Sequence, residues 1–135
     1  MSTATTELRR FLTITGRCLK NGRPAPEMFS PAVDAVWHEM LGTPQYTALC
    51  QETAGRSIGH VAANGYGPIA WVAAYEEAYG PLPQIWFTDA DGTVDQEAVA
   101  RYHLTGTVVA EWDCTPTGGD GDDGFAPEQP ETSRR

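Results

Sequence analysis

Two histidines and a cysteine, His38, Cys50 and His60, are the side chains of this sequence best suited to hold a transition metal ion. Zinc, copper and iron accept imidazole nitrogen and thiolate sulfur, and three such ligands leave a coordination position open for water or a substrate. Asp34 lies one helical turn before His38, where its carboxylate could bond the imidazole or join the metal. Cys114 could add a fourth ligand if the C-terminal segment folds back. The sequence thus predicts a metal site, with zinc first and copper or iron as alternatives.

The same residues also have a purely structural interpretation. Buried cysteines are common, and core histidines often make hydrogen bonds without binding a metal. Under this interpretation Cys50 belongs to the core, and His38 and His60 are satisfied by hydrogen bonds. His38-Glu39 begins like a zinc-protease helix, but the residue four after His38 is Gly42, so the second histidine of that motif is absent. No phosphate loop, Gly-x-Ser-x-Gly turn or Cys-x-x-Cys pair is present, so no reaction class or substrate can be named.

Helix start and stop signals place His38 and Cys50 on consecutive helices. Ser30-Pro31 supplies a capping hydroxyl and a proline at the first helical position, and Gly42 ends the predicted helix 31–41. Thr43-Pro44 repeats this signal, and Gly55 ends the next helix. Two helices joined by so short a link form an antiparallel hairpin or a sharp corner. In the hairpin, the axial offset between His38 and Cys50 is only about 5 Å, so both could reach one ion, with His60 coming from the following loop.

The remaining pattern predicts a mainly α fold: a compact helical domain built around the antiparallel helix hairpin. Further helices are predicted over 5–20, from Gly67-Pro68 to 79, and over 94–104. Two β-prone runs, 85–87 and 107–112, could pair as a short two-stranded ribbon. From Thr115 the composition turns to Gly, Asp, Pro, Glu, Ser and Thr, which predicts a disordered acidic tail. We therefore expect one helical domain over 1–114 and a tail over 115–135.

Charge and hydropathy limit the classes of partner that this protein is expected to bind. Nine basic and eighteen acidic side chains give a net charge of −9, which repels the phosphate backbone of nucleic acids. No apolar run approaches the roughly 18 residues needed to cross a bilayer, and the polar N-terminus lacks a signal core, which predicts a cytoplasmic protein without a membrane partner. The first 30 residues hold five basic and two acidic side chains, so this segment could face an acidic body or partner. A protein partner or a small molecule remains open, as does the oligomeric state.

Spaced residues resemble the signature of the glycine-rich-domain-containing-protein-like family. The matching positions are Val33-Asp34-x-x-Trp37-His38, Tyr46, Cys50, Gly55 and His60, followed by Tyr75, Tyr79-Gly80, Pro83 and Trp86. The resemblance covers residues 30–87 and implies a helical domain with a His/Cys site, but no settled activity. Gly59 and Ala62 stand where that family commonly has a second histidine and a proline, which places any role for paired histidines in doubt.

Two functions follow as expectations. The first is a small cytoplasmic metal-binding protein with a His38, Cys50 and His60 site, joined by Asp34 or Cys114, which could serve as an accessory enzyme of a biosynthetic pathway. The second is a non-catalytic protein-protein interaction module that holds no metal.

Overall fold

A computed structural model describes residues 2–118. The elements, in chain order, are α1 (Thr3–Lys20), α2 (Pro31–Met40), α3 (Pro44–Thr53), β1 (Gly59–Pro68), α4 (Val72–Tyr79), the 3-10 helix η1 (Gln84–Phe87), α5 (Gln96–Thr105) and β2 (Val109–Thr117). About half of the described residues are helical, and β1 and β2 form an antiparallel sheet. The prediction of a mainly α fold is therefore wrong: the protein is mixed α and β. Every helix within residues 2–118 is too short or too polar to span a lipid bilayer.

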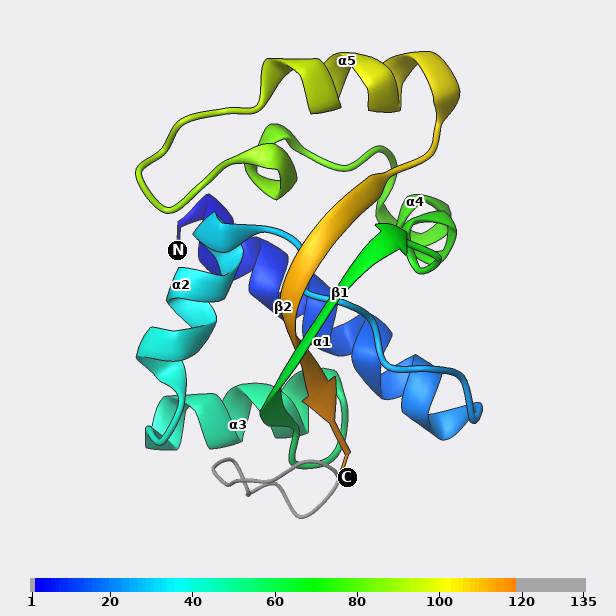
Figure 1. Cartoon of the computed structure of the whole chain (residues 1–135). Helices are drawn as coiled ribbons and strands as arrows, with labels where there is room; N and C mark the ends of the chain where they lie inside the picture. The colour runs from blue at the N-terminus through cyan, green and yellow to red at the C-terminus, as the bar shows by residue number, and fades with distance from the viewer. Residues whose placement is uncertain (1, 119–135) are drawn as a thin grey trace.

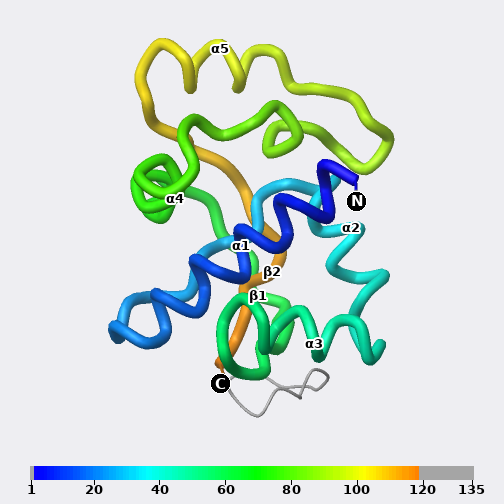
Figure 2. Tube along the Cα trace, turned by 180° about the vertical axis from the view of Figure 1, so that it is seen from behind, coloured from blue at the N-terminus to red at the C-terminus, as the bar shows by residue number. Residues whose placement is uncertain are grey.

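The long helix α1 is the element around which the others pack. Its buried face contacts α2, α3 and α4, and Figure 2 shows these helices ranged around it. An aromatic cluster fills the centre of the core, where Phe11 of α1 meets Trp37, Trp71 and Trp86 with ring centroids 5.4 to 5.9 Å apart. These rings are fully or almost fully buried. A core of this kind holds the surrounding elements in fixed positions, including those that carry the candidate site.

The two helices expected as an antiparallel hairpin form a corner instead. Both predicted caps are confirmed: the Ser30 hydroxyl accepts from the Val33 N–H and the Thr43 hydroxyl from the Tyr46 N–H. Figure 1 shows α3 running across the end of α2 rather than beside it. Each helix packs against α1 and contributes its buried side chains to the common core.

The sheet is a ribbon of two strands that crosses the helices (Figure 1). The strand predicted over 107–112 is confirmed in part: β2 begins at Val109 and ends at Thr117. The predicted partner, Ile85–Phe87, is a 3-10 helix, and the true partner is β1, which pairs Gly59 with Thr117 and Pro68 with Val109. Residues 115–117, assigned above to the tail, thus belong to the strand. The rest of the predicted tail, from residue 119, lies outside the described residues.

Strand β1 depends on a glycine beneath an indole. A Cβ added at Gly65 would lie 2.3 Å from Cζ2 of Trp112, its partner across the ribbon. We expect Gly65→Val to lower the free energy of unfolding by about 1–3 kcal/mol, because Trp112 must leave its place against β1. Urea denaturation measures this. Asn64→Thr, at an exposed position of the same strand, is the control and should stay within about 0.5 kcal/mol of the wild type.

Candidate metal centre

Helix α2 presents Asp34 and His38 together. The two residues are four apart, so their side chains lie on one face, while Val33 and Trp37 on the neighbouring face are fully buried. His38 Nε2 lies 3.1 Å from Oδ2 of Asp34. The His38 side chain is 55% exposed, whereas that of Asp34 is 24% exposed. The helix therefore offers one imidazole at the surface and one carboxylate just beneath it.

Strand β1 brings His60 to the other oxygen of the same carboxylate. His60 Nε2 lies 3.4 Å from Oδ1 of Asp34, and the imidazole rings of His38 and His60 are 4.4 Å apart and nearly perpendicular. The rings of His60 and Trp37 also meet edge to face, with their centroids 4.5 Å apart. Trp37 in turn donates to the Tyr46 hydroxyl, which donates to the carbonyl of Ile58. This chain of hydrogen bonds fixes the segment that leads into β1 and so fixes His60.

Cys114 of β2 is the third group that contacts this carboxylate. Its Sγ donates to Oδ1 of Asp34 over 3.1 Å, and its carbonyl accepts from the Met28 N–H. Burial and the nearby carboxylate of Asp34 raise the pKa of the Cys114 thiol far above its ordinary range. Cys114 is thus a protonated thiol that holds Asp34 in place, as the partners of metal ligands commonly do.

Asp34 is ionised in this environment. Burial alone would raise its pKa, but the hydrogen bonds from His60 and Cys114 and the charge of His38 outweigh burial and lower it below the ordinary value of 3.8. A carboxylate that keeps its charge at neutral pH can serve as a metal ligand without first losing a proton.

Within residues 2–118, Asp34, His38 and His60 form a group whose ligand atoms all lie within 4.8 Å of one another. A metal ion about 2.1 Å from each tetrahedral ligand places those ligands about 3.4 Å apart. The contacts of Asp34 with the two imidazoles, 3.1 Å through Oδ2 and 3.4 Å through Oδ1, are close to that spacing, although each uses a different carboxylate oxygen. Small side-chain rotations would thus let the three groups share one ion. Asp34, a secondary candidate in the sequence, is the residue that joins the two histidines.

Cys50 lies outside this group. It is 1% exposed, bonds the Tyr46 hydroxyl and the backbone of Ile58, and has a thiol pKa raised by burial. Tyr46 and Trp37 are the residues that connect it to His60, so the sulfur faces the core rather than the imidazoles. The convergence expected of His38, Cys50 and His60 is therefore realised for the two histidines alone, since Cys50 of α3 is buried beside Tyr46 and Ile58.

We expect Cys50→Ala to leave metal binding unchanged. The substitution removes a buried sulfur, so unfolding free energy should fall by about 1–2 kcal/mol while the metal affinity stays within about threefold of the wild type. Competition with a chelating dye measures the affinity, and urea denaturation the stability. If folded Cys50→Ala protein bound the metal more weakly as well as being less stable, Cys50 would have to be counted among the ligands.

Comparison with known proteins found no matching family model, no matching curated protein and no matching solved structure. The resemblance to the glycine-rich-domain-containing-protein-like family stays a prediction.

Proposed function

We propose that this protein binds a divalent transition metal ion, zinc in the first place, through Asp34, His38 and His60. The observation that supports this is the convergence of two imidazole nitrogens and an ionised carboxylate within 4.8 Å. These residues come from a helix and a strand far apart in the sequence. Cys50 is not part of the proposal.

The number of ligands and their exposure favour a reactive site over a structural one. Structural zinc sites are closed by four protein ligands, whereas catalytic sites use three and leave a position for water or a substrate. Here three ligands converge, and His38 is more than half exposed to solvent. If Asp34, His38 and His60 held a zinc ion, the ion would lower the pKa of a bound water to about 7 and would supply hydroxide near neutral pH. Two histidines and one carboxylate also suit iron(II), which makes iron the metal to test beside zinc.

Metal analysis of protein purified without a histidine tag tests the proposal. We expect about one zinc ion per chain by mass spectrometry after growth in zinc-supplemented medium, and restoration of that content after chelation and readdition. Cobalt(II) substitution gives a second reading, because visible absorption of the bound ion reports its geometry. One equivalent of iron in place of zinc would change the metal but keep the ligand set. A protein that takes up neither zinc, iron nor cobalt would overturn the proposal.

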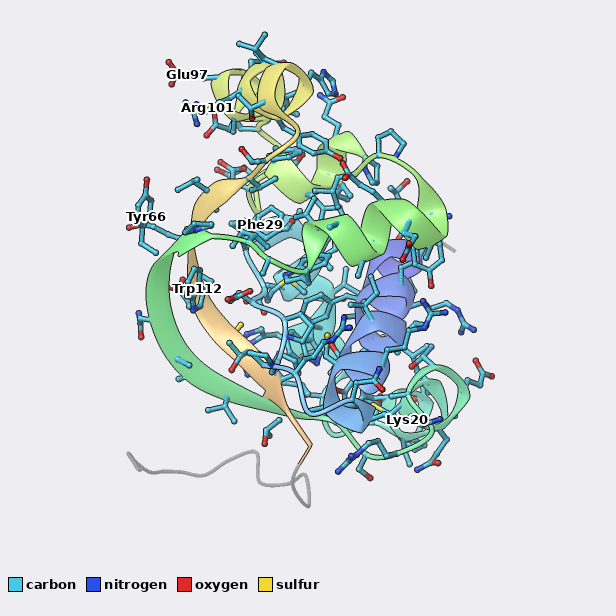
Figure 3. The ribbon with its side chains drawn as sticks, turned by 90° about the vertical axis from the view of Figure 1, so that its right-hand side faces the viewer. Lys20, Phe29, Tyr66, Glu97, Arg101 and Trp112 are labelled. Carbon is cyan, nitrogen blue, oxygen red and sulfur yellow. The ribbon has the colours of Figure 1, made fainter. Side chains whose placement is uncertain are left out.

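The interaction module is the second candidate function, and one surface favours it. The outer side of the ribbon exposes Val61, Tyr66 and Val109, and the Tyr66 side chain is 70% exposed. Figure 3 shows Tyr66 pointing away from the body of the protein. In this reading Asp34 and the two histidines form only a hydrogen-bonded cluster. If the protein binds one metal ion per chain and loses it when Asp34 is replaced, the site gives this second candidate no support.

A further inference from the structure

The C-terminal end of α1 and the residues just after it carry positive charges without acidic partners. Residues 1–23 hold five lysines and arginines. Two of them, on the first half of α1, form ion pairs with glutamates. The other three, Arg17, Lys20 and Arg23, are exposed and form no ion pair within residues 2–118. Such a surface attracts an acidic binding segment.

A cavity of about 480 Å³ lies beside these charges, between α1 and α4. Arg17 and Arg23 line it, and Glu77 is the acidic side chain among the described residues of its lining. The cavity therefore combines an apolar interior with a rim of net positive charge, which suits an apolar side chain flanked by carboxylates. Its apolar lining comprises Ile14, Cys18, Ala74, Ala78 and Tyr79.

The part of the chain that the structure describes ends next to this surface. A Cβ added at Gly118, directly after β2, would lie 2.9 Å from Cδ1 of Leu19 on α1. The Gly118 carbonyl also accepts a hydrogen bond from Arg56. Figures 1 and 3 show the end of β2 and the end of α1 on the same side of the molecule. The segment that follows Gly118 thus starts beside the last turn of α1.

The positions of the side chains around α1 lead from this point to the cavity. Successive residues of an α-helix are about 100° apart, so Lys20 follows Leu19 at about 100° and Arg17 at about 160°. On a helix about 11 Å in diameter, the path over the surface from Leu19 to Arg17 is about 15 Å. Seven extended residues span up to about 23 Å. Phe125, seven residues after Gly118, can therefore reach the cavity.

The segment after Gly118 has the complementary charge. Residues 119–131 hold five acidic side chains and no lysine or arginine. Three of these, Asp120, Asp122 and Asp123, precede Phe125, which is the only aromatic residue after Trp112. A segment of this composition has too few apolar side chains to form a core of its own, but it can bind a surface of opposite charge.

We propose that residues 119–125 bind the C-terminal end of α1. The three aspartates lie beside Arg17, Lys20 and Arg23, and Phe125 occupies the cavity between α1 and α4. A segment attached by a short linker meets its surface at a millimolar effective concentration, so a dissociation constant of about 0.1 mM for the separate segment already gives about tenfold more bound than free chains. Any acidic partner of this surface must displace the segment. The contact is independent of the proposed metal site.

The rate at which chymotrypsin cleaves after Phe125 tests the proposal. Mass spectrometry follows the product 1–125 of the full chain, and a synthetic peptide of residues 119–131 gives the rate for the unbound segment. In about 0.05 M NaCl we expect the full chain to be cleaved at least about tenfold more slowly than the peptide. In about 0.5 M NaCl the difference should shrink to about threefold or less, because salt screens the charges. Equal rates at low salt would overturn the proposal.

Charge variants locate the contact on α1. The double variant Arg17→Glu, Lys20→Glu should bring the rate of the full chain to within about twofold of the peptide, because the surface then repels the aspartates. Arg101→Glu, which reverses an exposed charge of α5, is the matched control and should keep the protection. Protection that survives the double variant would come from a contact elsewhere or from mere closeness to the folded body, and would overturn this surface as the binding site.

Two further variants test the partners of that surface. Replacement of the three aspartates by asparagine, in the chain and in its reference peptide, should remove the protection as the double variant does. Ala78→Phe fills the cavity without changing a charge and should speed cleavage by at least about threefold, whereas Ala78→Ser should not. Unchanged protection in both would overturn the proposal. Protection lost when the protein is diluted would show that a second copy supplies the surface, which contradicts a contact within one chain.

Discussion

Asp34→Ala is expected to lower the affinity for zinc by at least about 100-fold. Asp34 contacts both imidazoles and is the carboxylate of the three-ligand group, so its loss removes a ligand and releases the two histidines from their shared partner. Substitution of a mere partner of a metal ligand already costs about 10- to 100-fold, and a ligand costs more. Competition with a chelating dye of known affinity measures the change directly.

Thermal unfolding gives an independent reading of the same effect. A ligand that binds only the folded state stabilises it by about 2.7 kcal/mol when present at 100 times its dissociation constant. Zinc should therefore raise the melting temperature of the wild type and leave that of Asp34→Ala unchanged. Glu39→Gln removes a carboxylate one residue beyond His38 and should behave as the wild type. Equal zinc affinities for wild type and Asp34→Ala would show that the ion binds elsewhere.

The helical half of the site could be predicted from local signals. Serine or threonine followed by proline begins both α2 and α3, and spacing by four then places Asp34 and His38 on one face without any knowledge of the fold. Their 3.1 Å contact follows from this spacing. Local chemistry was sufficient here because both residues belong to the same helix.

The position of Cys50 could not be read from the same signals. Caps specify where α2 ends and α3 begins, but the angle between the helices depends on what each buries. Trp37 and Tyr46 both turn inward and bond each other, which forms the corner and directs Cys50 toward the core. The prediction assumed that two successive helices pack against each other, whereas both pack against α1.

Strand β1 was not predicted, because its sequence has little preference for the extended conformation. It contains glycines and an asparagine, and Gly67-Pro68 is typical of a helix start, yet α4 begins only at Val72. Pairing with β2 imposes the extended conformation, and the close approach of Trp112 explains why Gly65 is tolerated there. His60 reaches Asp34 only because this strand forms, so the complete site depends on tertiary contacts that the sequence does not display.

A second cluster, formed around Glu7 of α1, was not anticipated from the sequence, and we expect it to contribute strongly to stability. Glu7 is 2% exposed, and its Oε1 accepts from the Tyr75 hydroxyl at 2.6 Å and from the Trp86 indole at 2.9 Å. Its Oε2 accepts from Arg10 at 3.1 Å, and Arg10 also donates to Tyr75. One carboxylate thus joins α1, α4 and η1. Burial and the Glu7 carboxylate raise the pKa of Tyr75, so its hydroxyl stays protonated and donates.

Glu7→Ala is expected to reduce the free energy of unfolding by about 3 kcal/mol or more. The substitution leaves the Tyr75 hydroxyl and the Trp86 N–H buried without an acceptor, and removal of one member of a buried charged network costs about 3–5 kcal/mol. The melting temperature should fall by about 10 °C. Glu7→Gln keeps an oxygen for Tyr75 and Trp86 but turns an amide N–H₂ toward Arg10, so its loss should be smaller.

The matched control is Glu52→Ala, which removes another acidic side chain paired with an arginine of α1. Glu52 accepts from Arg9 at 2.8 Å, as short as the buried contacts, but its side chain is 60% exposed. Water replaces such a pair at little cost, so the control should lose less than about 1 kcal/mol. If Glu7→Ala and Glu52→Ala were equally mild in urea denaturation, hydrogen bonds to Glu7 would contribute no more than a surface ion pair. We expect the loss of unfolding free energy to be largest for Glu7→Ala, smaller for Glu7→Gln and smallest for Glu52→Ala. That order would show that burial of the acceptor, rather than the length of its contacts, determines how much the cluster stabilises the fold.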